Sequence, residues 1–81
     1  MTFEYDERRE AARYFGAVME ERRKALGISR DELAEKSGVS KSSIDNYAVG
    51  RCEPMALAIV RIAAALKTTP NYMLDIDWKG M

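Results

Sequence analysis

Residues 29–49 contain two short amphipathic segments joined by a turn. This feature limits the folds open to the chain more than any other part of its sequence. Glu32 follows Ser29 by three residues, which is the pattern of a capping box at a helix N-terminus. Gly38 interrupts the helical pattern and can adopt a left-handed backbone, and Ser40 can cap the next helix. The segment therefore predicts two helices with a tight turn between them.

Helical periodicity continues on both sides of this segment. Apolar residues recur at spacings of three and four, and no stretch shows the strict alternation that a half-buried strand requires. We expect helices over residues 7–26, 30–37, 41–49 and 55–66, and a last short helix that holds residues 72–74. The sequence therefore predicts an all-α fold, a compact domain of five helices.

Length and composition exclude several classes of protein. A chain of 81 residues has room for one domain with one modest core. No apolar run approaches the roughly 18 residues of a membrane span. The N-terminus lacks the basic segment followed by an apolar segment that marks a signal peptide. With one cysteine and no histidine, neither an internal disulfide nor a structural zinc site is expected. We expect a cytoplasmic protein with no membrane association, no metal and no cofactor.

Enzymatic activity is not expected either. The sequence has no histidine, Cys52 has no evident base to activate it, and no glycine-rich phosphate loop is present. No catalytic residues are therefore assigned.

The second helix of such a pair projects from the surface and can enter a DNA major groove. On a helical wheel with Ile44 facing the core, Ser42 and Asn46 lie nearly opposite to it. Lys41 and Asp45 flank them. The exposed face of residues 41–49 is therefore a candidate DNA-reading surface.

The stretch ISRDELAEKSGVSKSSIDNYAVGRCEP resembles the Cro/CI-type (XRE-type) helix-turn-helix regulators of phages and bacteria. The resemblance continues through MALAIVRIAAALKTTPNYML and extends back through RRKALG. It implies a lambda-repressor-like domain over residues 15–74, an N-terminal extension of the first helix over 1–14 and a tail over 75–81. It also implies a prokaryotic or phage-encoded, nucleoid-associated transcriptional regulator that binds DNA by sequence, as a repressor or an activator.

The resemblance implies base contacts from Lys41, Ser42 and Asn46, and Asp45 on the same face could accept a hydrogen bond from cytosine. An asparagine can pair bidentately with adenine, and a lysine can donate to guanine N7 and O6. Phosphate contacts are expected where helices begin and where the loop after the second helix runs. The residues at those places are Arg30, Ser40, Ser43 and Arg51.

The chain departs from the family pattern at two positions. Arg30 stands where the family usually has glutamine, which replaces a hydrogen-bonding amide with a charge. Ala48 stands where the family often has a glutamate that pairs with the arginine matching Arg23. Arg23 then either pairs elsewhere, with Glu20 as one candidate, or is free to meet phosphate.

A net charge of zero argues against tight binding to DNA, because affinity for DNA comes largely from neutralised phosphates. Two alternatives to a regulator therefore remain: the antitoxin of a toxin–antitoxin pair, and a protein-interaction module that has lost DNA binding. An antitoxin would dock its toxin through residues 1–14 or 75–81.

Residues near the two ends of the chain could bind a second copy of the chain. These residues form either a homodimer interface or a satellite cluster within one chain: Phe3, Tyr5, Arg9, Arg13 and Tyr14 at one end, and Ile76 and Trp78 at the other. A two-fold dimer would place two recognition helices about one DNA turn apart and imply a palindromic operator in double-stranded DNA.

Overall fold

The computed structural model describes residues 5–74, with side chains from Arg9 onward. In this part of the chain there are five helices and no strand: α1 (Tyr5–Ala25), α2 (Arg30–Ser37), α3 (Lys41–Ala48), α4 (Ala56–Ala65) and α5 (Pro70–Leu74). The all-α prediction and the order of its elements are confirmed. Phe3, Ile76 and Trp78 lie outside the described residues, as does the side chain of Tyr5.

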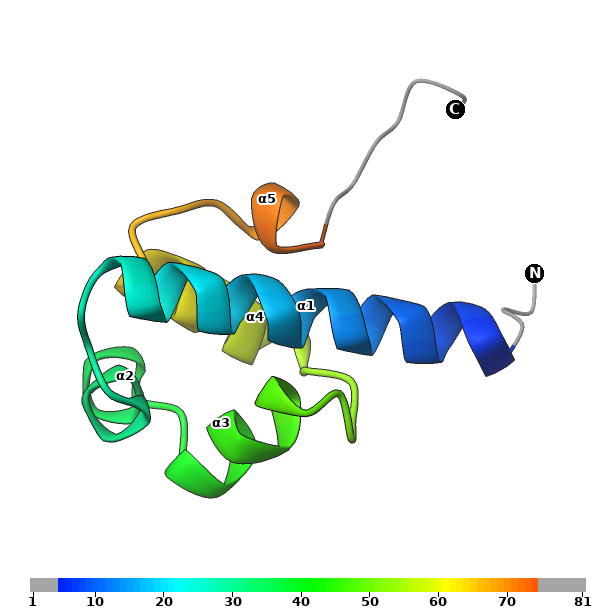
Figure 1. Ribbon diagram of the computed structural model, residues 1–81, viewed down its shortest axis with the longest axis horizontal. Coiled ribbons are helices and arrows are strands. Elements are labelled where there is room, and N and C mark those ends of the chain that lie inside the picture. The colour runs from blue at the N-terminus through cyan, green and yellow to red at the C-terminus, as the bar shows by residue number, and fades with distance from the viewer. Residues whose placement is uncertain (1–4, 75–81) are drawn as a thin grey trace.

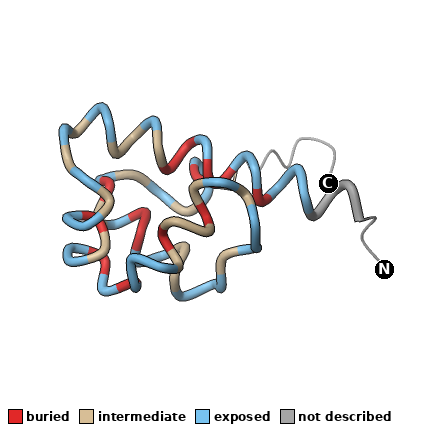
Figure 2. Tube along the Cα trace, turned by 60° about the horizontal axis from the view of Figure 1, so that its bottom comes forward, coloured by how far each residue is buried: buried red, intermediate tan, exposed pale blue. Residues whose placement is uncertain are grey.

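The helices enclose one apolar core. In Figure 1, α1 runs along the length of the molecule, with α2 and α3 on one side of it and α5 on the other. Figure 2 shows buried positions alternating with exposed ones along the described trace. The largest fully buried side chains of the described residues are Phe15, Met19, Leu33, Ile44, Ile62, Leu66 and Met73. Each contributes roughly 1.5–3 kcal/mol relative to an exposed position, so the core holds all five helices together.

The crossing of α1 over α3 depends on Gly16. A Cβ added at this residue would lie 2.1 Å from the main-chain oxygen of Tyr47, a distance that no real Cβ tolerates. Next to it, the rings of Phe15 and Tyr47 meet edge to face, with centroids 6.0 Å apart. α1 therefore lies directly on the backbone of α3 and fixes the tilt of that helix.

Arg22 connects α1 to α4. Its Nη2 donates to the main-chain oxygen of Leu66, the residue that caps the C-terminus of α4, at 2.9 Å. A cation at a helix C-terminus satisfies an orphan carbonyl and is favoured by the helix dipole.

The N-terminal turns of α1 extend past the other helices (Figure 1). The expected extension of the first helix covered residues 1–14; its described part, from Tyr5 onward, belongs to α1. Among the described residues, no helix has both the length and the apolar character needed to cross a membrane.

Candidate nucleic-acid interface

Local hydrogen bonds define α2, the turn and α3. The Ser29 hydroxyl accepts from the Glu32 N–H, and the Glu32 carboxylate accepts from the Ser29 N–H, both at 3.0 Å. This capping box was expected from the sequence. Gly38 has φ 74°, and its N–H donates to the Ala34 main-chain oxygen at 2.9 Å. The turn therefore has the left-handed residue that the glycine predicted.

The inner face of α3 is fixed by burial. Ile44 is fully buried and Tyr47 is nearly so, as expected from the helical wheel. Lys41 and Ser42 are exposed, and Asp45 and Asn46 are half-buried. One face of α3 thus belongs to the core, and the opposite face presents polar side chains to solvent.

Three helices meet at a cluster of charges around Arg30, the first residue of α2. Its Nη2 lies 2.8 Å from Glu20 Oε1 on α1, and its Nη1 lies 3.1 Å from Asp45 Oδ1 on α3. The second carboxylate oxygen of Asp45 accepts from Lys41 Nζ at 3.0 Å. The structure therefore places three of the candidate DNA contacts, Arg30, Lys41 and Asp45, in one ionic cluster anchored on Glu20.

Glu20 is the most enclosed carboxylate of this cluster. Arg23 Nε lies 2.8 Å from Glu20 Oε2, so Arg23 has the partner that the sequence suggested as one candidate. Arg23 Nη1 also donates to the main-chain oxygen of Ile28 at 2.8 Å. Hydrogen bonds from Arg23 and then from Arg30 lower the pKa of Glu20 from 4.5 to about 2, although burial opposes the shift.

Asp45 is ionised for a related reason. Its pKa is lowered by the hydrogen bond from Lys41 and then by the one from Arg30. This carboxylate on α3 is therefore partnered by two cations, which offset its negative charge.

Asn46 and Arg51 form a second pair. Arg51 Nη1 donates to Asn46 Oδ1 at 3.1 Å, and the Arg51 N–H donates to the Asn46 main-chain oxygen at 3.0 Å. The side-chain bond uses one of the two lone pairs of Asn46 Oδ1, the oxygen that a bidentate contact with adenine also requires, so Arg51 lies beside any base that Asn46 would contact. A phosphate is a suitable alternative partner for that guanidinium.

Ser40 and Ser43 cap α3. The Ser43 N–H donates to Ser40 Oγ at 3.2 Å, and the two hydroxyls are 3.0 Å apart. Both candidate phosphate contacts therefore already help to begin the helix. Ser40 and the first residues of α3, Lys41 and Ser42, are exposed, and a helix N-terminus favours an anion.

Sequence reasoning missed the link that Arg30 makes between α1 and α3. The pair Glu20–Arg23, which the sequence suggested, and the pair Lys41–Asp45 are separated by three and four residues, a spacing that brings side chains together on a helix. Arg30 lies 10 and 15 residues from its two partners, and no local pattern indicates such contacts. Gly16 was also missed, although a glycine inside a long helix costs about 1 kcal/mol and suggests a packing reason.

A glycine turn between two short helices, with the second helix exposed along one face, defines a helix-turn-helix DNA-binding fold. Residues 19–73 match the family model described as Helix-turn-helix. The chain belongs to this family, in its XRE-type branch of transcriptional regulators.

Two proteins illustrate the similarity. An uncharacterized HTH-type transcriptional regulator of Methanothermobacter thermautotrophicus is 41% identical over 49 residues, which cover 60% of this chain and 71% of that protein. The crystal structure of the restriction-modification controller protein C.AhdI from Aeromonas hydrophila aligns with a TM-score of 0.73 at 29% identity. That alignment covers 76% of this chain and 94% of the C.AhdI chain.

Proposed function

We propose that this protein binds double-stranded DNA by sequence, with α3 in the major groove, and represses transcription by occupying promoter DNA. The observation that carries the proposal is the two-sided character of α3. Ile44 and Tyr47 fix the helix to the core, while Lys41 and Ser42 are exposed on the other side. A rigidly held helix with one polar face is what readout of base edges requires.

Base readout is assigned to Ser42 and Asn46, with Lys41 and Asp45 at the side of the same face. Lys41 and Asp45 are bonded to each other in the free protein. Lys41 can exchange this intramolecular bond for guanine when DNA arrives, and Asp45 then keeps Arg30 as its partner. The base preference of Lys41 and Asp45 therefore depends on how the ionic cluster rearranges when DNA binds.

Phosphate contacts are assigned to the start of α2, the start of α3 and the loop after α3. The residues are Arg30, Ser40, Ser43 and Arg51, as the sequence suggested. Because the chain carries no net charge, we expect modest affinity that falls steeply with salt.

Selection of random duplexes by the purified protein, followed by affinity measurement at two salt concentrations, tests the proposal. We expect an enriched motif and weaker binding at higher salt. A motif with two-fold symmetry would support a palindromic operator read by a homodimer. Absence of any enriched motif, together with salt-independent affinity, would overturn the proposal and favour a protein-interaction module.

A further inference from the structure

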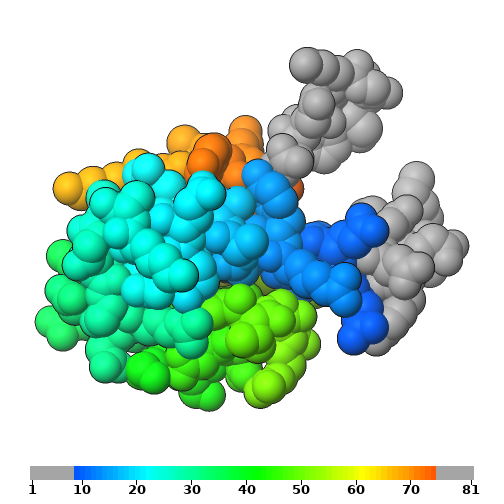
Figure 3. Space-filling view, in the orientation of Figure 1, coloured from blue at the N-terminus to red at the C-terminus, as the bar shows by residue number. Residues whose placement is uncertain are grey.

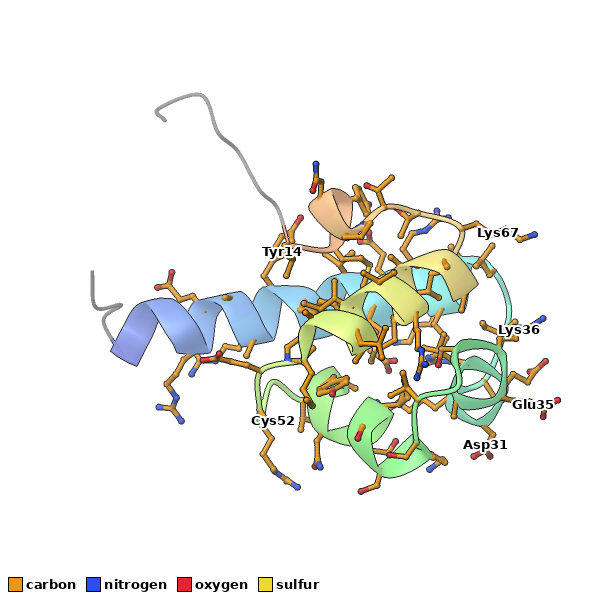
Figure 4. All side chains as sticks on the ribbon, turned by 180° about the vertical axis from the view of Figure 1, so that it is seen from behind. Tyr14, Asp31, Glu35, Lys36, Cys52 and Lys67 are labelled. Atoms are coloured by element: carbon orange, nitrogen blue, oxygen red, sulfur yellow. The ribbon has the colours of Figure 1, made fainter. Side chains whose placement is uncertain are left out.

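A cleft of about 640 Å³ lies between the N-terminal half of α1 and the loop that follows α3. Four charged side chains line it: Arg9 and Arg13 from α1, and Arg51 and Glu53 from the loop. Figure 3 shows this part of α1 next to the segment after α3, and Figure 4 shows Cys52 in the loop at the same place. The cleft therefore gathers three cations against one anion in a chain with no net charge.

The two α1 arginines point to one face because they are four residues apart on a helix. Arg13 is also held against the loop by Gly50, whose φ is 70°. A Cβ on Gly50 would lie 3.0 Å from Arg13 Cγ and 3.2 Å from Arg13 Cα. The stem of Arg13 thus packs on the bare backbone of the loop, and its position relative to α3 is fixed.

Arg51 joins the cleft to the recognition helix. Its guanidinium bonds to Asn46 Oδ1 at 3.1 Å, near the C-terminal end of α3. A ligand in the cleft therefore sits beside the DNA face rather than on the opposite side of the molecule. Guanidinium groups bind phosphate through planar, bidentate hydrogen bonds, so a cleft with three of them is suited to a phosphate group.

We infer that this cleft holds a backbone phosphate of DNA, on the flank of the segment that α3 reads. The inference rests on the proposed function and adds a phosphate contact to it. Arg9 and Arg13 precede residues 19–73, which match the family model, so this phosphate is bound by the N-terminal extension of α1. The two arginines also supply local positive charge that the chain as a whole lacks.

The test uses the full chain and the duplex that it selects, with affinity measured by fluorescence anisotropy over a range of salt. For the double variant Arg9→Gln, Arg13→Gln we expect binding weaker by on the order of tenfold and a lower slope of log K against log salt. The slope should fall by about one for each phosphate that the variant no longer neutralises, and the selected motif should stay the same.

Two further variants separate phosphate binding from folding and from general charge. Arg61→Gln removes an exposed arginine of α4 that does not line the cleft, and it should leave the slope nearly unchanged. Arg13→Lys keeps the positive charge, so its slope of log K against log salt should stay closer to that of the wild type than to that of the double variant. Circular dichroism of each variant confirms that the helices are retained.

Ethylation interference locates the phosphate. Wild-type protein should be blocked by ethylation at a phosphate outside the base-contacted segment, and the double variant should lose that signal. If the wild type binds its motif but the double variant keeps both the slope and the interference pattern, the inference is wrong and the proposed function stands. If the wild type selects no motif, the proposed function fails and this inference fails with it.

A free anion is the other source of the same chemistry. Titration of wild-type protein with inorganic phosphate, followed by NMR of the arginine Nε–H groups, measures it directly. Binding of phosphate at these arginines, with no change of DNA slope in the double variant, would assign the cleft to a small anion and overturn the DNA assignment.

Discussion

Arg30 bonds simultaneously to Glu20 on α1 and to Asp45 on α3, through nitrogen–oxygen distances of 2.8 and 3.1 Å. The first residue of α2 thus connects α3 to the long helix α1. A residue expected only as a phosphate contact also has an internal role, because its charge is partnered by two carboxylates. This relationship gives the domain a measurable dependence on pH.

Acid should weaken the fold through Glu20. Its pKa is about 2 in the folded protein and near 4.5 when unpaired. A lowered pKa stabilises the fold fully above the unfolded value, and this contribution is lost as the pH falls through the folded one. After allowance for solvent screening, we expect a loss of about 1–2 kcal/mol in the free energy of unfolding between pH 5 and 2.

Urea denaturation at a series of pH values measures this effect. Glu20→Gln should lower the stability at neutral pH by a similar amount, and its curve should approach that of the wild type near pH 2. Glu35→Gln on the exposed side of α2 (labelled in Figure 4) is the control and should follow the wild-type curve. Parallel curves for wild type and Glu20→Gln would contradict the assignment.

Gly16→Ala should destabilise the domain by about 3 kcal/mol or more, because the new Cβ would collide with the Tyr47 main-chain oxygen at 2.1 Å. Helix propensity alone predicts the opposite, a gain of about 1 kcal/mol. Chemical denaturation of Gly16→Ala distinguishes the expected loss of stability from the gain that helix propensity predicts. Gly27→Ala is the matched control: its φ is 71° and nothing lies within 4 Å, so it should cost only about 1 kcal/mol of backbone strain.

Asn46→Ala and Arg51→Ala should affect DNA binding differently, although the two side chains bond to each other. Loss of Asn46 should relax preference at one base position by about 1–3 kcal/mol. Loss of Arg51 should weaken binding to all sequences alike and lower the salt slope by about one. Repeating the selection with each variant measures both effects, and identical profiles would refute the division into base and phosphate contacts.

An exposed apolar stripe on α4 is a candidate homodimer surface other than the terminal residues that the sequence suggested. Leu57 and Val60 are 58% and 53% exposed and lie three residues apart, with exposed Ala64 on the same face. We expect the double variant Leu57→Glu, Val60→Glu to stay folded and to lower self-association at least about tenfold, because burying an unpaired charge costs several kcal/mol.

Sedimentation equilibrium over a range of concentrations measures this self-association. Ala25→Glu, which adds a charge at an exposed position of α1 away from the stripe, should leave it unchanged. A wild-type protein that is monomeric at every concentration tested would contradict the homodimer.

The sequence by itself determined the features that local interactions decide. Ser29, Glu32 and Gly38 fixed the start and end of α2, because a cap or a left-handed turn needs only residues a few positions apart. The periodicity of apolar residues assigned Ile44 and Tyr47 to the inside of α3 and Ser42 to the outside. The helix-turn-helix and its candidate reading face were therefore predictable.

Only the tertiary structure decided how the helices meet. Gly16 lies on the backbone of Tyr47, Arg30 bridges two other helices, and Arg13 packs directly against Gly50 at the cleft. These interactions join residues far apart in the sequence, and they depend on the angles at which whole helices pack rather than on any spacing along one of them. The tilt of α1 over α3 thus determines which charged side chains meet beside α3.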